Sequence, residues 1–379
     1  METKAIPRFR KTAETFRQGA KTLGRRYFVS EAVFEKEQER IFSNHWLCVG
    51  HQSQLAAAGD YFLVEAAGES LIVLRDRTSR FRAFYNVCRH RGTRMCEEAS
   101  GRFSQVIQCP YHAWTYTLDG KLAGAPHMDK VEEFDRGEYS LHAVNLELWE
   151  GFLFLNLDPD ARRLSKTFAA LEEKFSHWNL PMLRSAKRIE YDVRANWKLI
   201  FENYSECYHC PLVHPALSKL TPYDSAENDL IEGPFLGGFM PITKGKSLTM
   251  SGNACALPVG DIKAEDHHRV FYYSIFPNML LSLHPDYVMV HQIRPRSPDR
   301  TIICCDWLFH ADAFGRADFK PDDAVEFWDM TNRQDWHVCE LSQRGIGSRA
   351  YQPGPYSPRE SIPAAWDREY LRDFGETED

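Results

Sequence analysis

The sequence contains no apolar stretch long enough to cross a membrane and no excess of basic residues. Its 379 residues carry a formal net charge of −7, with Asp and Glu dispersed along the chain, so the charge gives no reason to expect a nucleic acid or an anionic membrane as partner. No apolar run of signal-peptide type follows Met1, and there is neither an internal repeat nor a low-complexity segment. We therefore expect a globular cytoplasmic protein whose length fits two domains.

The ten cysteines do not have the pattern of a disulfide framework, which small secreted domains use to support a core that is too small. In a chain without a leader, we expect cysteines to be reduced thiols. Some of them can then serve as metal ligands.

The first half of the chain has the pattern of a small all-β domain. After a basic and polar start, Ser30 precedes a helix-like stretch, and we treat residues 1–45 as an N-terminal helical segment. Short β-type stretches then alternate with Gly, Asp and Ser clusters until a break at 158–160. We therefore place the all-β domain at residues 46–158, with predicted strands at 61–65, 71–74, 81–87, 106–109 and 149–157.

Residues 159–379 mix helical and strand patterns. We predict a helical stretch after Ser165, a helix over 197–208 and a long helix from Pro321 to about Gln343. The predicted strands, the last four separated by tight turns, lie at 188–193, 269–276, 279–283, 287–294 and 301–309. This pattern favours an antiparallel sheet with helices on one side, which makes the chain as a whole α+β.

Two cysteine–histidine pairs lie in the first half. They are Cys88-x-His90 and, after a gap of 18 residues, Cys109-x-x-His112. Turn-forming residues flank both pairs, as expected if each pair lies at the tip of a hairpin-like loop. Two cysteines and two histidines can hold zinc, although a zinc finger would need a helical histidine pair at short spacing. One thiolate and one imidazole from each loop suit a [2Fe–2S] cluster, with both cysteines on one iron and both histidines on the other.

The segment 206–214 is the second concentration of potential metal ligands. A mononuclear non-haem iron needs two imidazoles and one carboxylate on one face, with the other face open for oxygen and substrate. His209 and His214 are five positions apart, about 140° around an ideal helix, so a straight helix would not bring them together. We interpret Pro211 as the interruption that turns His214 back towards His209. Two cysteines in this segment leave a zinc site as an alternative.

The carboxylate ligand is expected far downstream, on the helix predicted from Pro321. Asp335 is the only carboxylate within a stripe of about 60° on an ideal helix, whose other members are Trp328, Asn332, Cys339 and Ile346. A carboxylate on an apolar stripe is costly unless it is paired or bound to a metal. Asp335 is therefore the predicted third ligand, with an ion pair to an arginine as the alternative.

The two cysteine–histidine loops resemble those of Rieske oxygenases. The resemblance rests on Cys88-Arg89-His90-Arg91-Gly92 and Cys109-Pro110-Tyr111-His112-Ala113-Trp114, with a gap slightly longer than is typical. It implies an all-β Rieske domain that holds one [2Fe–2S] cluster through Cys88, His90, Cys109 and His112. For residues 159–379 it implies a helix-grip (START-like) catalytic domain with one mononuclear Fe²⁺.

The segment 206–214 and the surroundings of Asp335 are similar to the iron site of the same family. By this resemblance His209, His214 and Asp335 are the iron ligands. Glu206 is not a ligand; it is a bridge, hydrogen-bonded between the Rieske histidine of one subunit and an iron-ligand histidine of the next. Such a bridge implies a head-to-tail ring, a homotrimer.

The resemblance implies a terminal oxygenase, which uses electrons from NAD(P)H and O₂ to hydroxylate an organic substrate. The chain has no Gly-rich dinucleotide fingerprint after a strand and no Cys-x4-Cys-x2-Cys of a plant-type ferredoxin. A separate NAD(P)H-dependent reductase, alone or with a ferredoxin, is therefore implied.

The substrate class is indicated by Glu206, because many aromatic-ring oxygenases have Asp there. With Glu at this position, the segment resembles the branch that acts on quaternary ammonium compounds such as glycine betaine, choline or carnitine. Enzymes of that branch demethylate or cleave their substrates. Such a cation requires an aromatic cage, and the second half offers Tyr204, Tyr208, Phe235, Phe239, Tyr272, Tyr273 and Trp366. Two alternatives are an aromatic-ring substrate and a Rieske electron carrier without oxygenase activity, which would need no iron triad.

Overall fold

The computed structural model describes residues 8–376, and the chain forms two compact units. The small unit comprises residues 42–172, and the large unit combines the described residues before 42 with those from 173 onward. Within 8–376, no helix is both long and apolar enough to cross a membrane.

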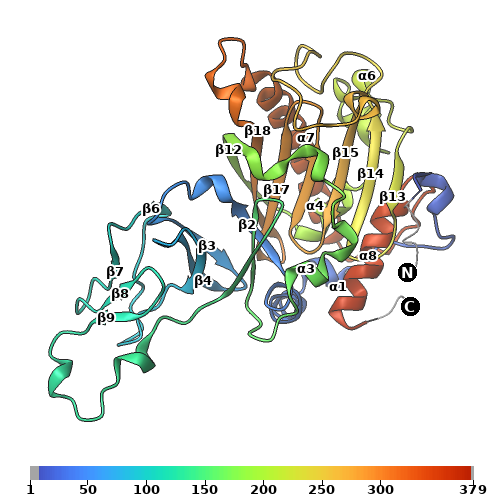
Figure 1. Cartoon of the computed structure of the whole chain (residues 1–379). Coiled ribbons are helices and arrows are strands. Elements are labelled where there is room, and N and C mark those ends of the chain that lie inside the picture. The colour runs from blue at the N-terminus through green and yellow to red at the C-terminus, as the bar shows by residue number, and fades with distance from the viewer. Residues whose placement is uncertain (1–7, 377–379) are drawn as a thin grey trace, which may run out of the picture. The chain divides into compact units, whose positions relative to one another are not determined.

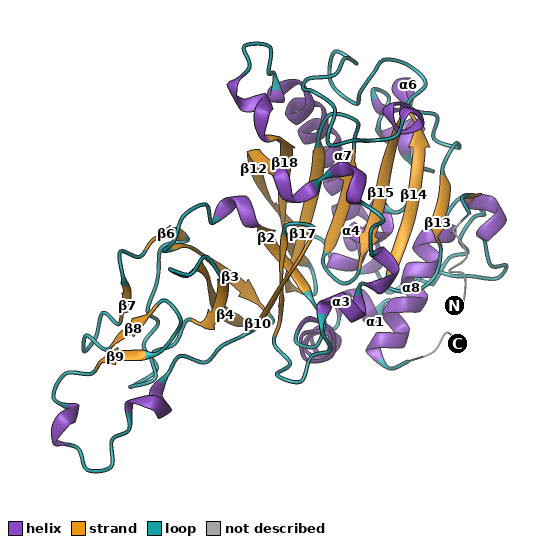
Figure 2. Ribbon diagram, viewed as in Figure 1, coloured by secondary structure: helices purple, strands orange, loops and turns teal. Residues whose placement is uncertain are grey.

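The small unit consists of three antiparallel sheets (Figure 2), which confirms the expected all-β domain. Their strand orders are β5-β4-β3-β6, β10-β11-β2 and β7-β8-β9. The centre of β4, residues 71–74, is fully buried, as its unbroken apolar run predicts. The strands are β2 (Leu47–His51), β3 (Asp60–Ala66), β4 (Glu69–Arg75), β5 (Phe81–Tyr85), β6 (Ser100–Arg102), β7 (Val106–Gln108), β8 (Thr115–Thr117), β9 (Leu122–Gly124), β10 (Asn145–Trp149) and β11 (Phe152–Asn156), and α3 (Leu164–Thr167) follows them.

The large unit is built on one antiparallel sheet of eight strands in the order β1-β13-β14-β15-β16-β17-β18-β12. The antiparallel sheet expected for this half is confirmed. Its strands are β1 (Arg10–Lys11), β12 (Leu183–Val193), β13 (Glu227–Leu230), β14 (Phe235–Pro241), β15 (Arg269–Ile275), β16 (Met279–Leu283), β17 (Val288–Ser297) and β18 (Arg300–His310).

Three helices, α4, α7 and α8, pack together and against this sheet (Figure 1). Pro321 begins α7 at the position where proline is favoured, and the predicted apolar stripe of that helix is buried. The helices are α1 (Arg26–Val29), α2 (Glu31–Glu37), α4 (Trp197–Tyr204), α5 (Cys210–Val213), α6 (Leu217–Leu220), α7 (Pro321–Ile346) and α8 (Ser361–Phe374).

A buried ion pair joins α2 to α4. Lys198 Nζ lies 2.5 Å from Glu37 Oε1, and both side chains are 0% exposed. Glu37 also accepts hydrogen bonds from Trp197 Nε1 at 2.9 Å and Tyr370 Oη at 2.7 Å. Burial lowers the pKa of Lys198 and the Glu37 carboxylate opposes this shift. Removing only one partner would leave a charge buried without compensation.

Candidate metal centres and pocket

The two cysteine–histidine loops have the same backbone geometry. The N–H of Gly92 donates to the carbonyl of Cys88 at 3.0 Å, and the N–H of Ala113 donates to that of Cys109 at 3.2 Å. Each cysteine N–H in turn donates to a carbonyl five residues later, at 2.8 Å. Gly92 (φ 72°) and Ala113 (φ 57°) are left-handed at equivalent positions. Both pairs therefore lie in tight loops, as the turn residues predicted.

The structure brings the two loops together. The rings of His90 and His112 are 4.7 Å apart, and Trp114 stacks on His90. Cys88 and Cys109 are buried, whereas the two histidines are half-buried. Burial raises the pKa of Cys109, and the neighbouring Cys88 thiol raises it further. A hydrogen bond from the N–H of Tyr111 opposes this shift. Two thiols on the inner side and two imidazoles on the outer side form a donor set that fits a [2Fe–2S] cluster with two cysteines on one iron and two histidines on the other.

The segment before the second site leaves the helix earlier than predicted. The expected helix over 197–208 ends at Tyr204, because local side-chain bonds compete with it. Ser205 Oγ donates to the carbonyl of Phe201 at 2.6 Å, and the Glu206 carboxylate accepts from the N–H groups of Tyr208 and His209. Pro211 then lies in the first turn of α5, where proline is favoured. Pro211 therefore belongs to a new helix that begins at Cys210. The preceding helix has already ended at Tyr204, so the interpretation of Pro211 as its interruption is wrong.

The structure gathers the three predicted ligands. His209 Nε2 and His214 Nε2 are 3.2 Å apart, and Asp335 Oδ1 lies 3.2 Å from the first and 2.7 Å from the second. Donors about 2.1 Å from a metal and at right angles to one another lie about 3 Å apart, so this geometry fits one face of an octahedral site. Asp335 faces two histidines and, within residues 8–376, forms no ion pair with an arginine, so the arginine alternative is wrong.

An acceptor behind each imidazole fixes which nitrogen faces the centre. Glu206 Oε1 lies 2.5 Å from His209 Nδ1, and Gln334 Oε1 lies 2.8 Å from His214 Nδ1. Both imidazoles therefore keep a proton on Nδ1, which leaves Nε2 as the nitrogen that can bind a metal beside Asp335. Gln334 was not predicted from the sequence, because only the fold places it beside His214.

The carboxylates of Glu206 and Asp335 favour a positive charge at the two histidines. Burial alone would lower the pKa of His209, but hydrogen bonds to Asp335 and Glu206 raise it to about 10. Burial would raise the pKa of Asp335, yet the same histidines lower it. A divalent metal supplies the positive charge that these carboxylates favour.

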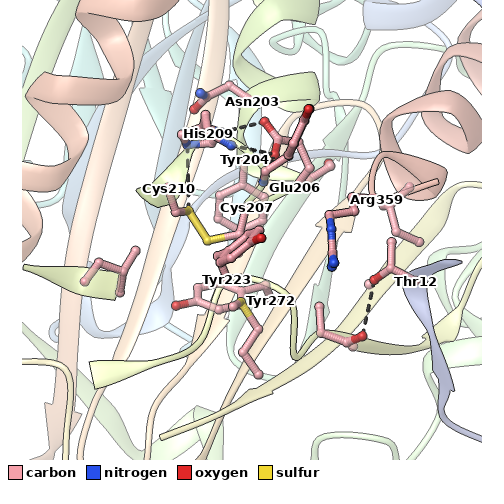
Figure 3. Close-up of a pocket in the computed structure, with 18 of the residues that line it drawn as sticks. Thr12, Asn203, Tyr204, Glu206, Cys207, His209, Cys210, Tyr223, Tyr272 and Arg359 are labelled. Carbon is pink, nitrogen blue, oxygen red and sulfur yellow. Dashed lines mark hydrogen bonds and ion pairs between the residues drawn. A yellow bond between two sulfur atoms is a disulfide. The ribbon is translucent and has the colours of Figure 1, made fainter. Parts of the chain in front are cut away.

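A cavity of about 380 Å³ opens on this centre, between the sheet and the helices of the large unit (Figure 3). Its aromatic lining consists of Tyr204, Tyr208, Tyr223, Phe239, Tyr272, Trp328 and Trp336. Four of the seven aromatics named from the sequence are among them, whereas Phe235, Tyr273 and Trp366 do not line the cavity. His291, a buried imidazole whose pKa burial lowers to about 4, also lines it.

Two cysteines beside the centre are oxidised. Cys207 and Cys210 form a disulfide with Cα atoms 4.9 Å apart, so the expectation that all ten cysteines are thiols is wrong for this pair. The Cys-x-x-Cys spacing at the start of α5 brings the two Cα atoms within disulfide range. Cys210 shares a cluster of potential ligands with His209 and His214, but a disulfide sulfur offers no thiolate. A zinc site that uses these cysteines is therefore not supported.

Two family models match the chain. The model described as Rieske [2Fe-2S] domain matches residues 45–135, and the model described as Ring hydroxylating alpha subunit (catalytic domain) matches residues 180–373. The glycine betaine monooxygenase oxygenase subunit of Chromohalobacter salexigens is 32% identical, over 90% of this chain and 83% of that protein. The carnitine monooxygenase oxygenase subunit of Escherichia coli K12 is 41% identical, over 55% of this chain and 56% of that protein.

A solved structure has the same fold. The quaternary ammonium Rieske monooxygenase CntA in complex with L-carnitine superimposes with a TM-score of 0.79, at 28% identity, over 94% of this chain and 96% of that one. A naphthalene 1,2-dioxygenase from Rhodococcus, at 20% identity and a TM-score of 0.77, also shares the fold.

Proposed function

Because the chain belongs to the ring-hydroxylating alpha subunits of the Rieske oxygenases, we propose that it is a cytoplasmic terminal oxygenase that oxidises an N-methyl quaternary ammonium compound. The family makes the chain an oxidoreductase with a Rieske cluster and a mononuclear iron, so the electron-carrier and zinc alternatives do not hold. We also propose that residues 46–158 carry the cluster and residues 159–379 the iron, after an N-terminal segment at 1–45.

The residues that would hold the two cofactors are those that the geometry brings together. Cys88, His90, Cys109 and His112 would hold the [2Fe–2S] cluster, and His209, His214 and Asp335 would hold Fe²⁺. When bound, the iron supplies oxygen activation with electrons that arrive through the cluster. Gln334 orients His214. Glu206 orients His209 and keeps a proton on Nδ1 of that histidine.

Glu206 is suited to join two subunits. Its Oε1 already contacts His209 Nδ1, and a second hydrogen bond to the Rieske histidine of a neighbouring subunit would complete the predicted bridge. We propose the head-to-tail homotrimer on this basis, since a ring places each iron beside a neighbour's cluster. A reductase supplies the electrons to family members, and we propose an NAD(P)H-dependent reductase, alone or with a ferredoxin, for this chain.

The observation that carries the substrate class is the aromatic lining of the cavity at the iron ligands. Tyr204 of α4, Tyr272 of β15 and Trp328 of α7 line it, and the Tyr272 ring contacts the other two. Asp335 lies on the same helix as Trp328. Aromatic faces attract a quaternary ammonium group, at about 0.5–2 kcal/mol per desolvated contact. The relatives named above act on glycine betaine and carnitine, which supports the same class here. An aromatic-ring substrate is the second candidate, because the same faces can stack on it.

The test is substrate-dependent oxygen uptake by the iron-loaded protein with a generic reductase. The panel contains glycine betaine, carnitine, choline and aromatic acids, and product formation is measured alongside. Asp335→Ala should abolish turnover while leaving the cluster absorption intact. Asp322→Ala, an exposed aspartate on the same helix, is the matched control. Uptake with aromatic acids and with no quaternary ammonium compound would contradict the proposal.

A further inference from the structure

The cavity carries a cationic side chain at the side away from His209 (Figure 3). Arg359, in the loop before α8, lines the cavity, and its guanidinium reaches into it beside Tyr223. The guanidinium carbon lies 5.2 Å from the centre of the Tyr223 ring. Tyr223 therefore supports the guanidinium from one face and leaves its edges, where the N–H donors lie, to other partners.

The donors of Arg359 are available to a ligand. Within residues 8–376, its guanidinium forms no hydrogen bond, and its ion partner Asp224 is 3.9 Å away. That distance is beyond hydrogen-bond range, and the two side chains are 43% and 50% exposed. An ion pair this open is worth little. A carboxylate that presented two oxygens to the fork of the guanidinium would bind better than Asp224 does.

The cavity has acidic side chains at the metal centre and two basic side chains elsewhere. Glu206 and Asp335 lie at the metal centre. Lys11, on the edge strand β1, and Arg359 line the cavity away from it, where Asp224, the loosely held ion partner of Arg359, is the acid among the described lining residues. A substrate that carried only a positive charge would gain at the aromatic faces and be repelled by the two basic side chains. A substrate with a positive group at one end and a negative group at the other would gain from both.

We infer that Arg359 binds the carboxylate of a zwitterionic substrate, so that the chain acts on quaternary ammonium carboxylates in preference to quaternary ammonium alcohols. This inference rests on the proposed function and deepens it. The ammonium group lies among the aromatic side chains near the iron ligands, and the carboxylate is turned towards Arg359. Asp224 competes for the same guanidinium and weakens binding until the substrate displaces it.

The experiment compares glycine betaine with choline, which share the trimethylammonium group and differ in the carboxylate. We measure kcat and KM for both with the cofactor-loaded protein and reductase, and the dissociation constant of glycine betaine by calorimetry. Arg359→Gln should lower the ratio of kcat/KM for glycine betaine to that for choline by about 10- to 100-fold, mainly through KM. Arg359→Lys should give an intermediate loss, because an ammonium group cannot bind a carboxylate through a planar fork.

Two further variants separate the charge effect from general damage. Asp224→Asn should lower the KM for glycine betaine, since it removes the competing acid. Arg349→Gln makes the same change of charge at an exposed arginine outside the cavity and should leave both substrates unaffected. Unchanged cluster absorption and melting temperature show that each variant is folded.

The outcomes distinguish the inference from the proposed function. A wild-type preference for choline, or an equal loss for both substrates in Arg359→Gln, would overturn the role of Arg359 and leave the oxidation of quaternary ammonium compounds standing. If the wild-type protein oxidised neither compound and took only aromatic acids, the substrate class itself would be wrong. A loss confined to glycine betaine supports both.

Discussion

Removing the acceptor behind His214 should weaken iron binding without unfolding the protein. Gln334 Oε1 lies 2.8 Å from His214 Nδ1 and holds the imidazole in the tautomer whose Nε2 can bind a metal beside Asp335. Gln334→Leu has about the same size and no acceptor, so the ring can take the other tautomer or rotate. Gln334→Glu keeps an acceptor at the same position and is the matched control.

The expected loss of iron affinity depends on how many ligand imidazoles lose their hydrogen-bond acceptor. The loss of a hydrogen bond behind a ligand histidine costs about 10- to 100-fold in metal affinity, which corresponds to about 1.4–2.7 kcal/mol. His209 keeps its own partner, Glu206, at 2.5 Å. Because one imidazole of two is affected, we expect the lower part of this range, about 10- to 30-fold.

The assay is the dissociation constant of the mononuclear Fe²⁺, measured by competition with a chelator. The Rieske absorption gives the concentration of cluster-loaded protein independently of the iron site, because the proposed cluster ligands lie in the other compact unit. An unchanged melting temperature shows that the large unit is folded. Gln334→Leu with wild-type affinity would refute the role of the acceptor. An equal loss in Gln334→Glu would also refute it, since that variant keeps the hydrogen bond.

Three further predictions concern the acids of the large unit. Glu206→Gln should retain both cofactors while product formation falls about 10- to 100-fold, measured against the rate at which the reduced cluster is reoxidised. Glu37→Gln removes the carboxylate that is paired with the buried Lys198 and should lower the free energy of unfolding by about 3–5 kcal/mol in urea, with most of it recovered on adding Lys198→Met. Burial, and then the charge of Asp367, raise the pKa of Glu202 well above its ordinary 4.5, so the folded state keeps a proton that the unfolded chain releases. The free energy of unfolding should therefore fall as pH rises above about 4.5, and Glu202→Gln should flatten that slope between pH 5 and 8.

The sequence predicts the elements that bury continuous apolar runs and misses those that depend on neighbours. The strand over 279–283 is found with its observed ends as β16, because all of its residues are buried. β14 contains Gly237 and Gly238, although glycine disfavours strands. Both positions need glycine because the neighbouring strands approach too closely for a side chain. A Cβ on Gly237 would lie 2.0 Å from the carbonyl oxygen of Tyr272. No local pattern in the sequence contains that information.

The helix α8 is not among the elements predicted from the sequence, although its residues have a helical pattern. Trp366, Tyr370 and Phe374 recur at intervals of four and are all buried, which is the pattern of an amphipathic helix. Pro363 lies near the start of α8, where a proline is tolerated.

The site residues also divide into those that a local sequence pattern indicates and those that depend on contacts in the folded chain. Asp335 could be chosen from helical periodicity alone, because it is the one carboxylate on a buried stripe of α7. Gln334 and Tyr223 could not be chosen, since their importance comes from contacts that only the folded chain makes, with His214 and Arg359.

The two acceptors behind the imidazoles differ in whether they can take up a proton. Glu206 is a carboxylate and can take up a proton from His209 Nδ1, whereas the amide of Gln334 can hold the Nδ1 proton of His214 in place but cannot accept it. A metal bound at Nε2 would make both imidazoles more acidic at Nδ1. Of the two imidazoles, only that of His209 has a hydrogen-bond partner able to accept its Nδ1 proton, which agrees with the proposed bridge from Glu206 to a neighbouring cluster. Gln334 therefore fixes the orientation of the His214 imidazole without exchanging its proton.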